Sequence, residues 1–234
     1  MIPKVIHYCW FGGRPLPKSA KKCIASWKKF MPDYEVKEWN ESNFDINLMP
    51  YTRDAYNDGK YAFVSDVARF WVLYHDGGVY FDTDVEVIRS IDDIVQRGAM
   101  MGWERPDANC VCHVAPGLGL VAPKGLPFYQ EMLDGFAKIS YHLPDGSRNP
   151  YSMIPMINDL LLQKGLLMDG SMQKISDVTI YPPDYFCPMD SLTGEITLTE
   201  NTHTIHRYTM SWMNKSTQWR VKMMRVVRRL CNNL

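Results

Sequence analysis

Two aspartates separated by one residue, Asp82 and Asp84, are the side chains whose type and spacing most strongly indicate chemistry in this chain. They end the apolar run 79–81, which we predict to be a buried strand, and in a strand the side chains at i and i+2 share one face. Two carboxylates there repel each other unless a cation neutralises them. Carboxylate oxygens select Mg²⁺ or Mn²⁺, which commonly binds phosphate as well. The pair therefore predicts a metal site, and the alternative is a surface turn with two solvated acids.

A second charged pair, Asp66 and Arg69, lies on a segment that predicts a buried helix. Residues 60–75 are apolar on most helical faces, and side chains three apart on a helix point the same way. Gly77 and Gly78 then end the helix and connect it directly to the strand before Asp82. We therefore expect both charged pairs to face one cleft. The alternative for Asp66 and Arg69 is a purely structural ion pair.

The elements around these pairs indicate an α/β fold. A strand at 4–10, a helix at 19–30 and a strand at 34–39 give the order β-loop-α-β, which starts an α/β sandwich. The other expected strands are at 100–103, 119–122 and 204–206, with a hairpin turn at Gly194 before 195–199, and the other expected helices are at 91–95, 126–140, 152–163 and 215–231. We expect the aromatic segment 181–188 to be irregular.

Composition excludes several classes of protein. The 234 residues hold 26 Lys and Arg against 26 Asp and Glu, which argues against a nucleic-acid binder that works by bulk charge. A hydrophobic fraction of 46% excludes a disordered chain, and the length suits one domain with an appendage. We find no signal peptide and no run long enough to span a bilayer. The six scattered cysteines then indicate reduced thiols, so we expect a cytoplasmic protein.

The zero net charge is a cancellation between two parts of the chain. After Glu200 there is no acid and there are seven bases, so residues 1–200 carry a net charge of 19 − 26 = −7. The basic tail also has helical apolar spacing, at Trp219, Met223, Val226, Val227 and Leu230. One interpretation is a helix that docks on the body by this stripe. The other is contact with an anionic membrane surface, at the inner face of the plasma membrane.

Three blocks in order resemble the DXD-containing sugar transferases of glycosyltransferase family 32. The blocks are HYCWFGG at 7–13, FVSDVAR at 63–69 and GGVYFDTD at 77–84. The family includes capsule-type bacterial polysaccharide transferases and yeast mannosyltransferases, and the glucosylating clostridial toxins are similar more distantly. The resemblance implies a GT-A fold, with one Rossmann-like nucleotide-sugar-binding domain and a mixed central sheet. We assign 1–214 to this catalytic domain and 215–234 to a basic amphipathic helix.

The resemblance also implies roles for individual residues. Trp10 is expected to stack on the nucleobase with Ile6 and His7 beside it, and Gly12 and Gly13 would admit the nucleotide backbone. Asp66, Arg69 and the neighbouring Ser65 are expected at the donor sugar, and Asp82 at the ribose. The family's metal, Mn²⁺ or Mg²⁺, is expected on Asp84, on Asp82 directly or through water, and on His206 from near the C-terminus, with His203 as the local competitor. Ser211 and Trp212 resemble an element that closes over the diphosphate.

The function implied is retaining transfer of a hexose from a nucleotide sugar, with a UDP-sugar favoured, to a glycan or lipid-linked glycan. A metal-dependent phosphohydrolase also uses Asp-x-Asp, but Glu86 stands where that class has Thr or Val. A dinucleotide site at Gly117-x-Gly119-x-x-Ala122 lacks a strand and a helix around it. A non-catalytic nucleotide-sugar or carbohydrate binding module is the remaining alternative. No nucleic-acid partner is expected.

Overall fold

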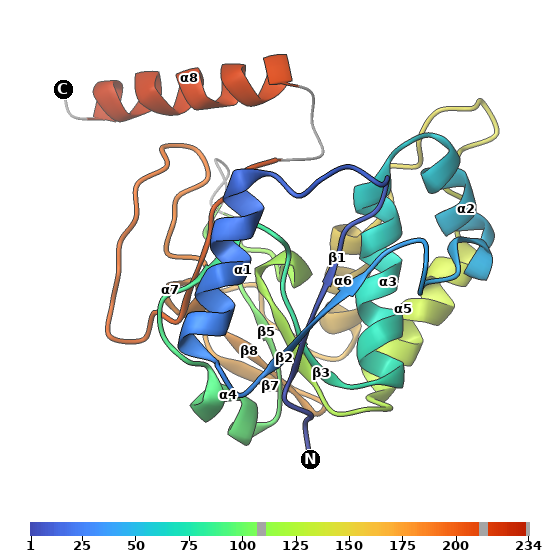
Figure 1. Ribbon diagram of the computed structural model, residues 1–234, viewed down its shortest axis with the longest axis horizontal. Coiled ribbons are helices and arrows are strands. Elements are labelled where there is room, and N and C mark those ends of the chain that lie inside the picture. The colour runs from blue at the N-terminus through green and yellow to red at the C-terminus, as the bar shows by residue number, and fades with distance from the viewer. Residues whose placement is uncertain (107–110, 211–214, 233–234) are drawn as a thin grey trace.

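The computed structural model describes residues 1–106, 111–210 and 215–232 and has a three-layer α/β architecture (Figure 1). The strands are β1 (Val5–Cys9), β2 (Glu35–Trp39), β3 (Gly78–Tyr80), β4 (Val85–Val87), β5 (Ala99–Gly102), β6 (Leu120–Ala122), β7 (Gln173–Ile175), β8 (Val178–Tyr181) and β9 (Thr204–His206). The α-helices are α1 (Lys18–Phe30), α2 (Pro50–Asn57), α3 (Tyr61–His75), α4 (Asp92–Arg97), α5 (Pro127–Lys138), α6 (Met153–Gln163), α7 (Pro183–Phe186) and α8 (Lys215–Asn232). Short 3₁₀ helices cover Ile46–Leu48 and Pro116–Leu118.

Seven strands form one mixed sheet in the order β2-β1-β3-β6-β5-β8-β7. Strands β1, β2 and β3 are parallel to one another, and β6 is antiparallel to β3 and β5. The carboxyl ends of β1 and β3 therefore meet at one edge of the sheet, which is where α/β proteins usually bind ligands. A second sheet pairs β4 with β9, with Val85 opposite His206.

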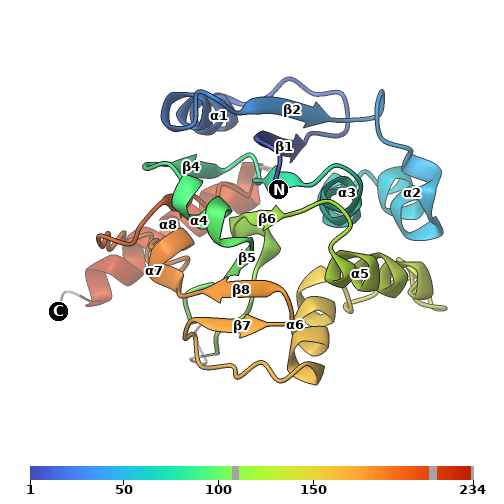
Figure 2. The same ribbon diagram turned by 90° about the horizontal axis from the view of Figure 1, so that it is seen from below.

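Helices cover both faces of the large sheet (Figures 1 and 2). On one face α3, α5 and α6 pack into a core that contains Val64, Phe136 and Ile157. On the other face α1, α4 and α7 pack into a core that contains Trp27 and Phe186. The burial of α3 on most sides agrees with the all-round apolar pattern of its sequence.

The connection from α3 to β3 requires glycine at two successive positions. Gly77 and Gly78 have φ of +70° and +108°, and an added Cβ would lie 2.7 Å from Lys124 N and from Val5 O respectively. Residues with a side chain rarely adopt such φ values. The two glycines thus let the chain reverse from α3 into the centre of the sheet, which carries Asp82 to the carboxyl edge.

The structure corrects three expectations about elements. Asp82 and Asp84 lie in a turn between β3 and β4 and not in one continuous strand, because the chain leaves the large sheet there to form the second one. The segment 181–188 is not wholly irregular, since β8 ends and α7 forms within it. Residues 195–199 form only a bridge between Met189 and Ile196. Within the described residues, no helix has both the length and the hydrophobicity that crossing a bilayer requires.

Candidate active site

Arg69 on α3 bridges two aspartates at the carboxyl edge of the sheet. Its Nη2 lies 3.1 Å from Asp66 Oδ1 and 3.2 Å from Asp82 Oδ1, and its side chain is only 4% exposed. The Arg69 guanidinium also stacks over the Tyr80 ring, and Tyr80 Oη donates a hydrogen bond of 3.0 Å to Asp82 Oδ1. Asp66 and Arg69 of α3 and Asp82 after β3, which we expected to face one cleft, therefore lie together.

Burial sets the protonation of this triad. It raises the pKa of Asp66 to about 6, against the opposing charge of Arg69. It raises the pKa of Asp82 as well, again against Arg69. Burial would lower the pKa of Arg69, but the charges of Asp82, Tyr80 and Asp66 outweigh it and raise the pKa further. Arg69 is therefore a permanent cation fixed between two carboxyl groups.

Asp84 faces a different set of partners, on the C-terminal part of the chain. His206 Nε2 lies 3.1 Å from Asp84 Oδ1, and Thr209 donates to Asp84 Oδ2 through its backbone N at 2.8 Å and its hydroxyl at 3.1 Å. Burial alone would raise the pKa of Asp84, but His206 and the Thr209 hydrogen bonds hold it well below its usual range. Asp84 is therefore ionised and held in one orientation.

The Asp84–His206 pair fits two ligands of one divalent ion. Neighbouring ligands of an octahedral ion at about 2.1 Å stand about 3 Å apart, which matches the 3.1 Å between Asp84 Oδ1 and His206 Nε2. His206 Nδ1 is buried and has no hydrogen-bond partner among the described residues, so the hydrogen-bonding contact that the structure describes for this ring is that of Nε2 with Asp84. His203, the competitor, instead uses its Nδ1 on Ser90 O at 2.7 Å and is buried away from Asp84.

Among the described residues, no third side chain is placed beside this pair as a metal ligand. Within residues 1–106, 111–210 and 215–232, no group of three or more His, Cys, Asp or Glu side chains is placed to hold a metal ion. The Asp82 carboxylate points at Arg69 and Tyr80, because the turn between β3 and β4 directs the two aspartates to different partners. In this arrangement Asp82 would reach an ion on Asp84 through water.

Helix α1 fixes the position of the turn that carries Asp84. Trp27 Nε1 donates to Val85 O at 2.7 Å, and Ser26 Oγ accepts from Val87 N at 2.9 Å. Val85 N in turn donates to Asp82 O at 3.0 Å and closes the turn. Because Trp27 is fully buried, the strand after Asp84 is anchored in the core.

The residues expected around the nucleobase differ from one another in how deeply they are buried. Ile6 and His7 lie in the core, and both His7 ring nitrogens already have protein partners, Gly77 O at 2.9 Å and Trp39 Nε1 at 3.0 Å. Their side chains therefore stabilise the sheet, and their expected place beside the nucleobase stays a prediction. Trp10 is half-buried at the end of β1, where its Nε1 donates to Arg14 O. Its position leaves ring surface accessible beside the carboxyl edge.

The remaining expected contacts are a serine, two glycines and two residues near the C-terminus. Ser65 Oγ donates to Tyr61 O, 3.1 Å away on its own helix. Gly12 and Gly13 have φ of +90° and +64°, and an added Cβ on Gly12 would lie 2.2 Å from the Tyr61 ring. Ser211 and Trp212 lie outside the described residues.

Sequence reasoning missed three residues that shape the site. Tyr80 and Thr209 hold Asp82 and Asp84, but a tyrosine in a strand and a threonine in a loop carry no recognisable signal. Gly117 did carry a signal, because it belongs to the Gly117-x-Gly119 pattern, which has no strand and helix around it to form a dinucleotide site. An added Cβ there would lie 2.6 Å from Asp82 Oδ2, so the glycine makes room for that carboxylate.

We expect Gly117→Ala to lower the catalytic activity of this site by roughly a hundredfold, because small misplacements of catalytic groups have effects of this size. The methyl group would push Asp82 away from Arg69, and no positive φ adds backbone strain. Gly135→Ala is the matched control, since its Cβ would meet the flexible end of Met156 at 2.7 Å, on α5. Equal kcat values for wild type and Gly117→Ala would show that the position of Asp82 is unimportant.

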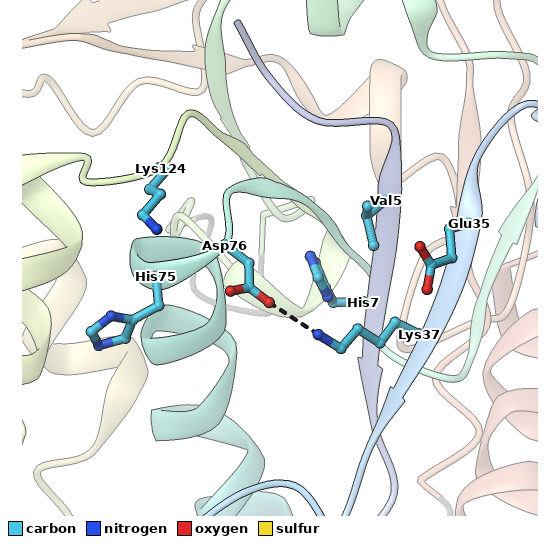
Figure 3. Close-up of a pocket in the computed structure, with 7 residues that line it drawn as sticks. All are labelled: Val5, His7, Glu35, Lys37, His75, Asp76 and Lys124. Carbon is cyan, nitrogen blue, oxygen red and sulfur yellow. Dashed lines mark hydrogen bonds and ion pairs between the residues drawn. The ribbon is translucent and has the colours of Figure 1, made fainter.

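A separate pocket of about 280 Å³ lies at the opposite, amino end of the strands (Figure 3). Its charges are mixed, and the Lys37–Asp76 ion pair of 3.1 Å spans it. Its lining residues are Val5, His7, Glu35, Lys37, His75, Asp76 and Lys124. Because β1 and β3 are parallel and Asp82 follows β3, this pocket is far from the aspartates of the candidate site.

Comparison with known proteins confirms the resemblance seen in the sequence. Residues 17–100 match the family model described as "Glycosyltransferase sugar-binding region containing DXD motif". Inositol phosphoceramide mannosyltransferase 3 of Schizosaccharomyces pombe is 28% identical over 152 residues, which cover 61% of this chain and 40% of that protein. Inositol phosphoceramide mannosyltransferase 2 of the same yeast is 33% identical over 41% of this chain and 28% of that protein. The chain thus spans well under half the length of these relatives.

Solved structures show the fold. The PaToxG glycosyltransferase superposes with a TM-score of 0.53 and 20% identity, over 70% of each chain. A glycosyltransferase involved in glycosylation of the major capsid of PBCV-1 superposes with a TM-score of 0.52 and 8% identity, over 95% of this chain and 99% of that one. The α/β fold predicted from the sequence, a GT-A fold with a mixed central sheet, is confirmed.

Proposed function

We propose that this chain, which carries the DXD-containing sugar-binding region of the glycosyltransferases, is a metal-dependent glycosyltransferase. It transfers a hexose from a nucleotide sugar to a glycan or lipid-linked glycan and retains the anomeric configuration. Residues 1–214 form its catalytic domain, and 215–234 form a basic appendage. The cytoplasmic location expected from the sequence stays a prediction.

The observation that carries this proposal is the pairing of two charged units at one edge of the sheet. Asp84 and His206 offer adjacent oxygen and nitrogen ligands, and Arg69 stands between Asp66 and Asp82. The first unit suits a cation that binds a diphosphate. The second offers a fixed positive charge and two hydrogen-bond acceptors, which suits a sugar with several hydroxyl groups.

Each residue of the two charged units has a defined role in sugar transfer. When bound by Asp84 and His206, a divalent ion supplies Lewis-acid stabilisation of the departing diphosphate. Arg69 adds a preorganised positive charge, and one such group is worth about 3 kcal/mol of transition-state stabilisation. Asp66 orients sugar hydroxyls and favours the positive charge that develops on the ring. Thr209 keeps Asp84 in its ligating orientation.

The retaining course agrees with how the carboxylates are engaged. Asp66 and Asp82 are bound to Arg69, and Asp84 is bound to His206. An inverting enzyme needs a base on the ring face opposite the leaving group, whereas a front-face retaining route lets the leaving phosphate accept the acceptor's proton. Because these three carboxylates are already paired, they suit the front-face retaining route, which needs no carboxylate as a base.

Donor and acceptor are proposed by class. The half-buried Trp10 at the end of β1 offers a stacking surface for a nucleobase, and we favour UDP. The relatives named above are inositol phosphoceramide mannosyltransferases, so mannose belongs among the sugars to be tested. Their names also support a lipid-linked acceptor.

The proposal is tested by release of nucleoside diphosphate from a panel of UDP- and GDP-sugars, with Mn²⁺, with Mg²⁺ and with EDTA. We expect release from at least one donor with either ion and none with EDTA. Release of inorganic phosphate from simple phosphate esters would instead indicate a phosphohydrolase. Donor binding without turnover, in the presence of a glycan acceptor panel, would indicate a binding module.

A further inference from the structure

The apolar stripe of helix α8 is exposed to solvent. Trp219 is 63% exposed, Met223 47%, Val226 58% and Val227 54%. At about 100° per residue, Trp219, Met223 and Val226 lie in one row, with Val227 beside it. The first interpretation of the sequence, a helix that docks on the body by this stripe, is therefore wrong for the stripe residues that the structure describes.

The helix is attached to the body by basic side chains instead. Arg225 Nε donates to Ser191 O at 3.0 Å, and Arg229 Nη2 donates to Thr193 O at 3.0 Å. Gly194 lies directly beneath, where an added Cβ would stand 3.2 Å from Arg229 Nη2. These contacts use another side of the helix, so the body does not cover the stripe.

Positive charge borders the stripe on both sides. Arg220 lies beside the stripe on one flank and Lys222 on the other, and both side chains are exposed. No acid occurs after Glu200, so no side chain of the same segment neutralises these bases. An apolar row between bases is the pattern of a helix that lies in the interface of an anionic bilayer.

The position of α8 suits such a role. Figure 1 places α8 at the top and the N-terminus at the bottom, and β1 rises between them with its carboxyl end toward α8. In Figure 2, seen from below, α8 lies behind the sheet. Helix α8 therefore lies at the end of the molecule where Asp82 and Asp84 stand.

A second copy of the chain is a weaker match for the stripe. An 18-residue helix is about 27 Å long, and one row of side chains along it covers much less than the roughly 800 Å² per partner that stable complexes bury. A bilayer requires no such area, because a helix gains binding energy from shallow insertion together with charge attraction.

We infer that α8 is a docking surface for an anionic lipid bilayer, which it contacts through Trp219, Met223 and Val226, with Arg220 and Lys222 at the headgroups. The inference does not depend on sugar transfer, since binding to vesicles requires neither donor nor metal. Docking through this end would present the carboxyl edge of the sheet toward the membrane.

Flotation of the full chain with vesicles tests the inference. We expect binding to vesicles of phosphatidylcholine mixed with phosphatidylglycerol, and weak binding to phosphatidylcholine alone. Because the attraction is partly electrostatic, raising the salt concentration should weaken binding. Binding that is equal on both vesicle types, or absent on both, would overturn the inference.

Two variants and a matched control separate the causes. The double variant Arg220→Glu, Lys222→Glu should lose affinity for the anionic vesicles by at least about a hundredfold. Trp219→Ser with Val226→Ser should lose about tenfold or more. The control Lys28→Glu, Lys29→Glu changes net charge equally, at exposed lysines on α1, and should bind almost as the wild type does.

Two further results would contradict the inference. Equal losses in the control and in the α8 charge variant would show that only net charge matters. A dimer in lipid-free sedimentation that Trp219→Ser with Val226→Ser abolishes, with vesicle binding unchanged, would assign the stripe to a second copy. Circular dichroism confirms that each variant is folded, and nucleoside diphosphate release without lipid should be unchanged in all of them.

Discussion

Asp84→Asn should lower metal-dependent release of nucleoside diphosphate at least about a thousandfold, since a Lewis-acid ion contributes several kcal/mol to the transition state. Asparagine keeps the shape of the side chain and one oxygen that Thr209 N can donate to. It removes the anionic charge beside His206. The loss should therefore come from the missing ligand and not from a displaced turn.

Metal affinity provides a second readout for this prediction. Titration of Mn²⁺ followed by calorimetry should show binding to the wild type in the presence of nucleoside diphosphate and none to Asp84→Asn. Glu86→Gln is the control, since Glu86 lies two residues further on, in β4, and pairs with Lys22 and Arg207. We expect its activity to stay within about threefold of the wild type. EDTA-sensitive turnover by Asp84→Asn at a wild-type rate would contradict the assignment of Asp84 as a metal ligand.

The sequence predicted best those parts of the fold that a single segment specifies. The buried helix with Asp66 and Arg69, the Gly77-Gly78 stop and the central strand follow from local pattern, and α3 and β3 lie within two residues of their expected bounds. Strands β7 and β8, the last two at one side of the large sheet, were missed. Strand β8 pairs with β5, which lies about 75 residues earlier in the chain, and β7 joins the sheet only through β8.

In the site, as in the fold, local sequence patterns predicted the contacts within one segment but not the contacts between distant segments. Periodicity placed Asp66 and Arg69 on one helix face, and the ion pair between them is present. Strand periodicity failed for Asp82 and Asp84, because β4 pairs with β9 from the far end of the chain and breaks the strand between the two aspartates. Thr209 comes to Asp84 by the same long-range pairing, which no local pattern in residues 82–84 could predict.

Arg69→Met should destabilise the fold by about 3–5 kcal/mol at pH 7.5, because removing one partner of a buried ion pair leaves uncompensated charge. Methionine retains much of the apolar stem, so a cavity contributes little. The variant would have to bury the carboxyl groups of Asp66 and Asp82 without a positive partner. Arg97→Met is the control, since Arg97 forms an exposed pair of 3.6 Å with Asp93 and should cost less than about 1 kcal/mol.

The pH dependence of this loss follows from the pKa of Asp66. Burial already raises that pKa to about 6 in the wild type, and loss of the Arg69 charge raises it further. As pH rises from about 4 through this value, the unfolded chain releases its proton before the folded one does, so stability falls with pH. Arg69→Met should therefore lose more stability relative to wild type at pH 8 than at pH 5. Denaturant unfolding at both pH values measures the difference.

Two companion variants separate stability from catalysis at Arg69. Adding Asp66→Asn to Arg69→Met removes one of the two stranded charges and should recover part of the stability at pH 8, but it should not restore the activity that the Arg69 charge supports. Arg69→Lys keeps the charge and should recover most of the stability. A single ammonium group cannot offer the separate, fixed nitrogens that now face Asp66 and Asp82, so activity should remain at least about tenfold below wild type. Full activity in Arg69→Lys would mean that Arg69 acts only as a structural charge, because the fixed geometry of the guanidinium is what the catalytic role requires.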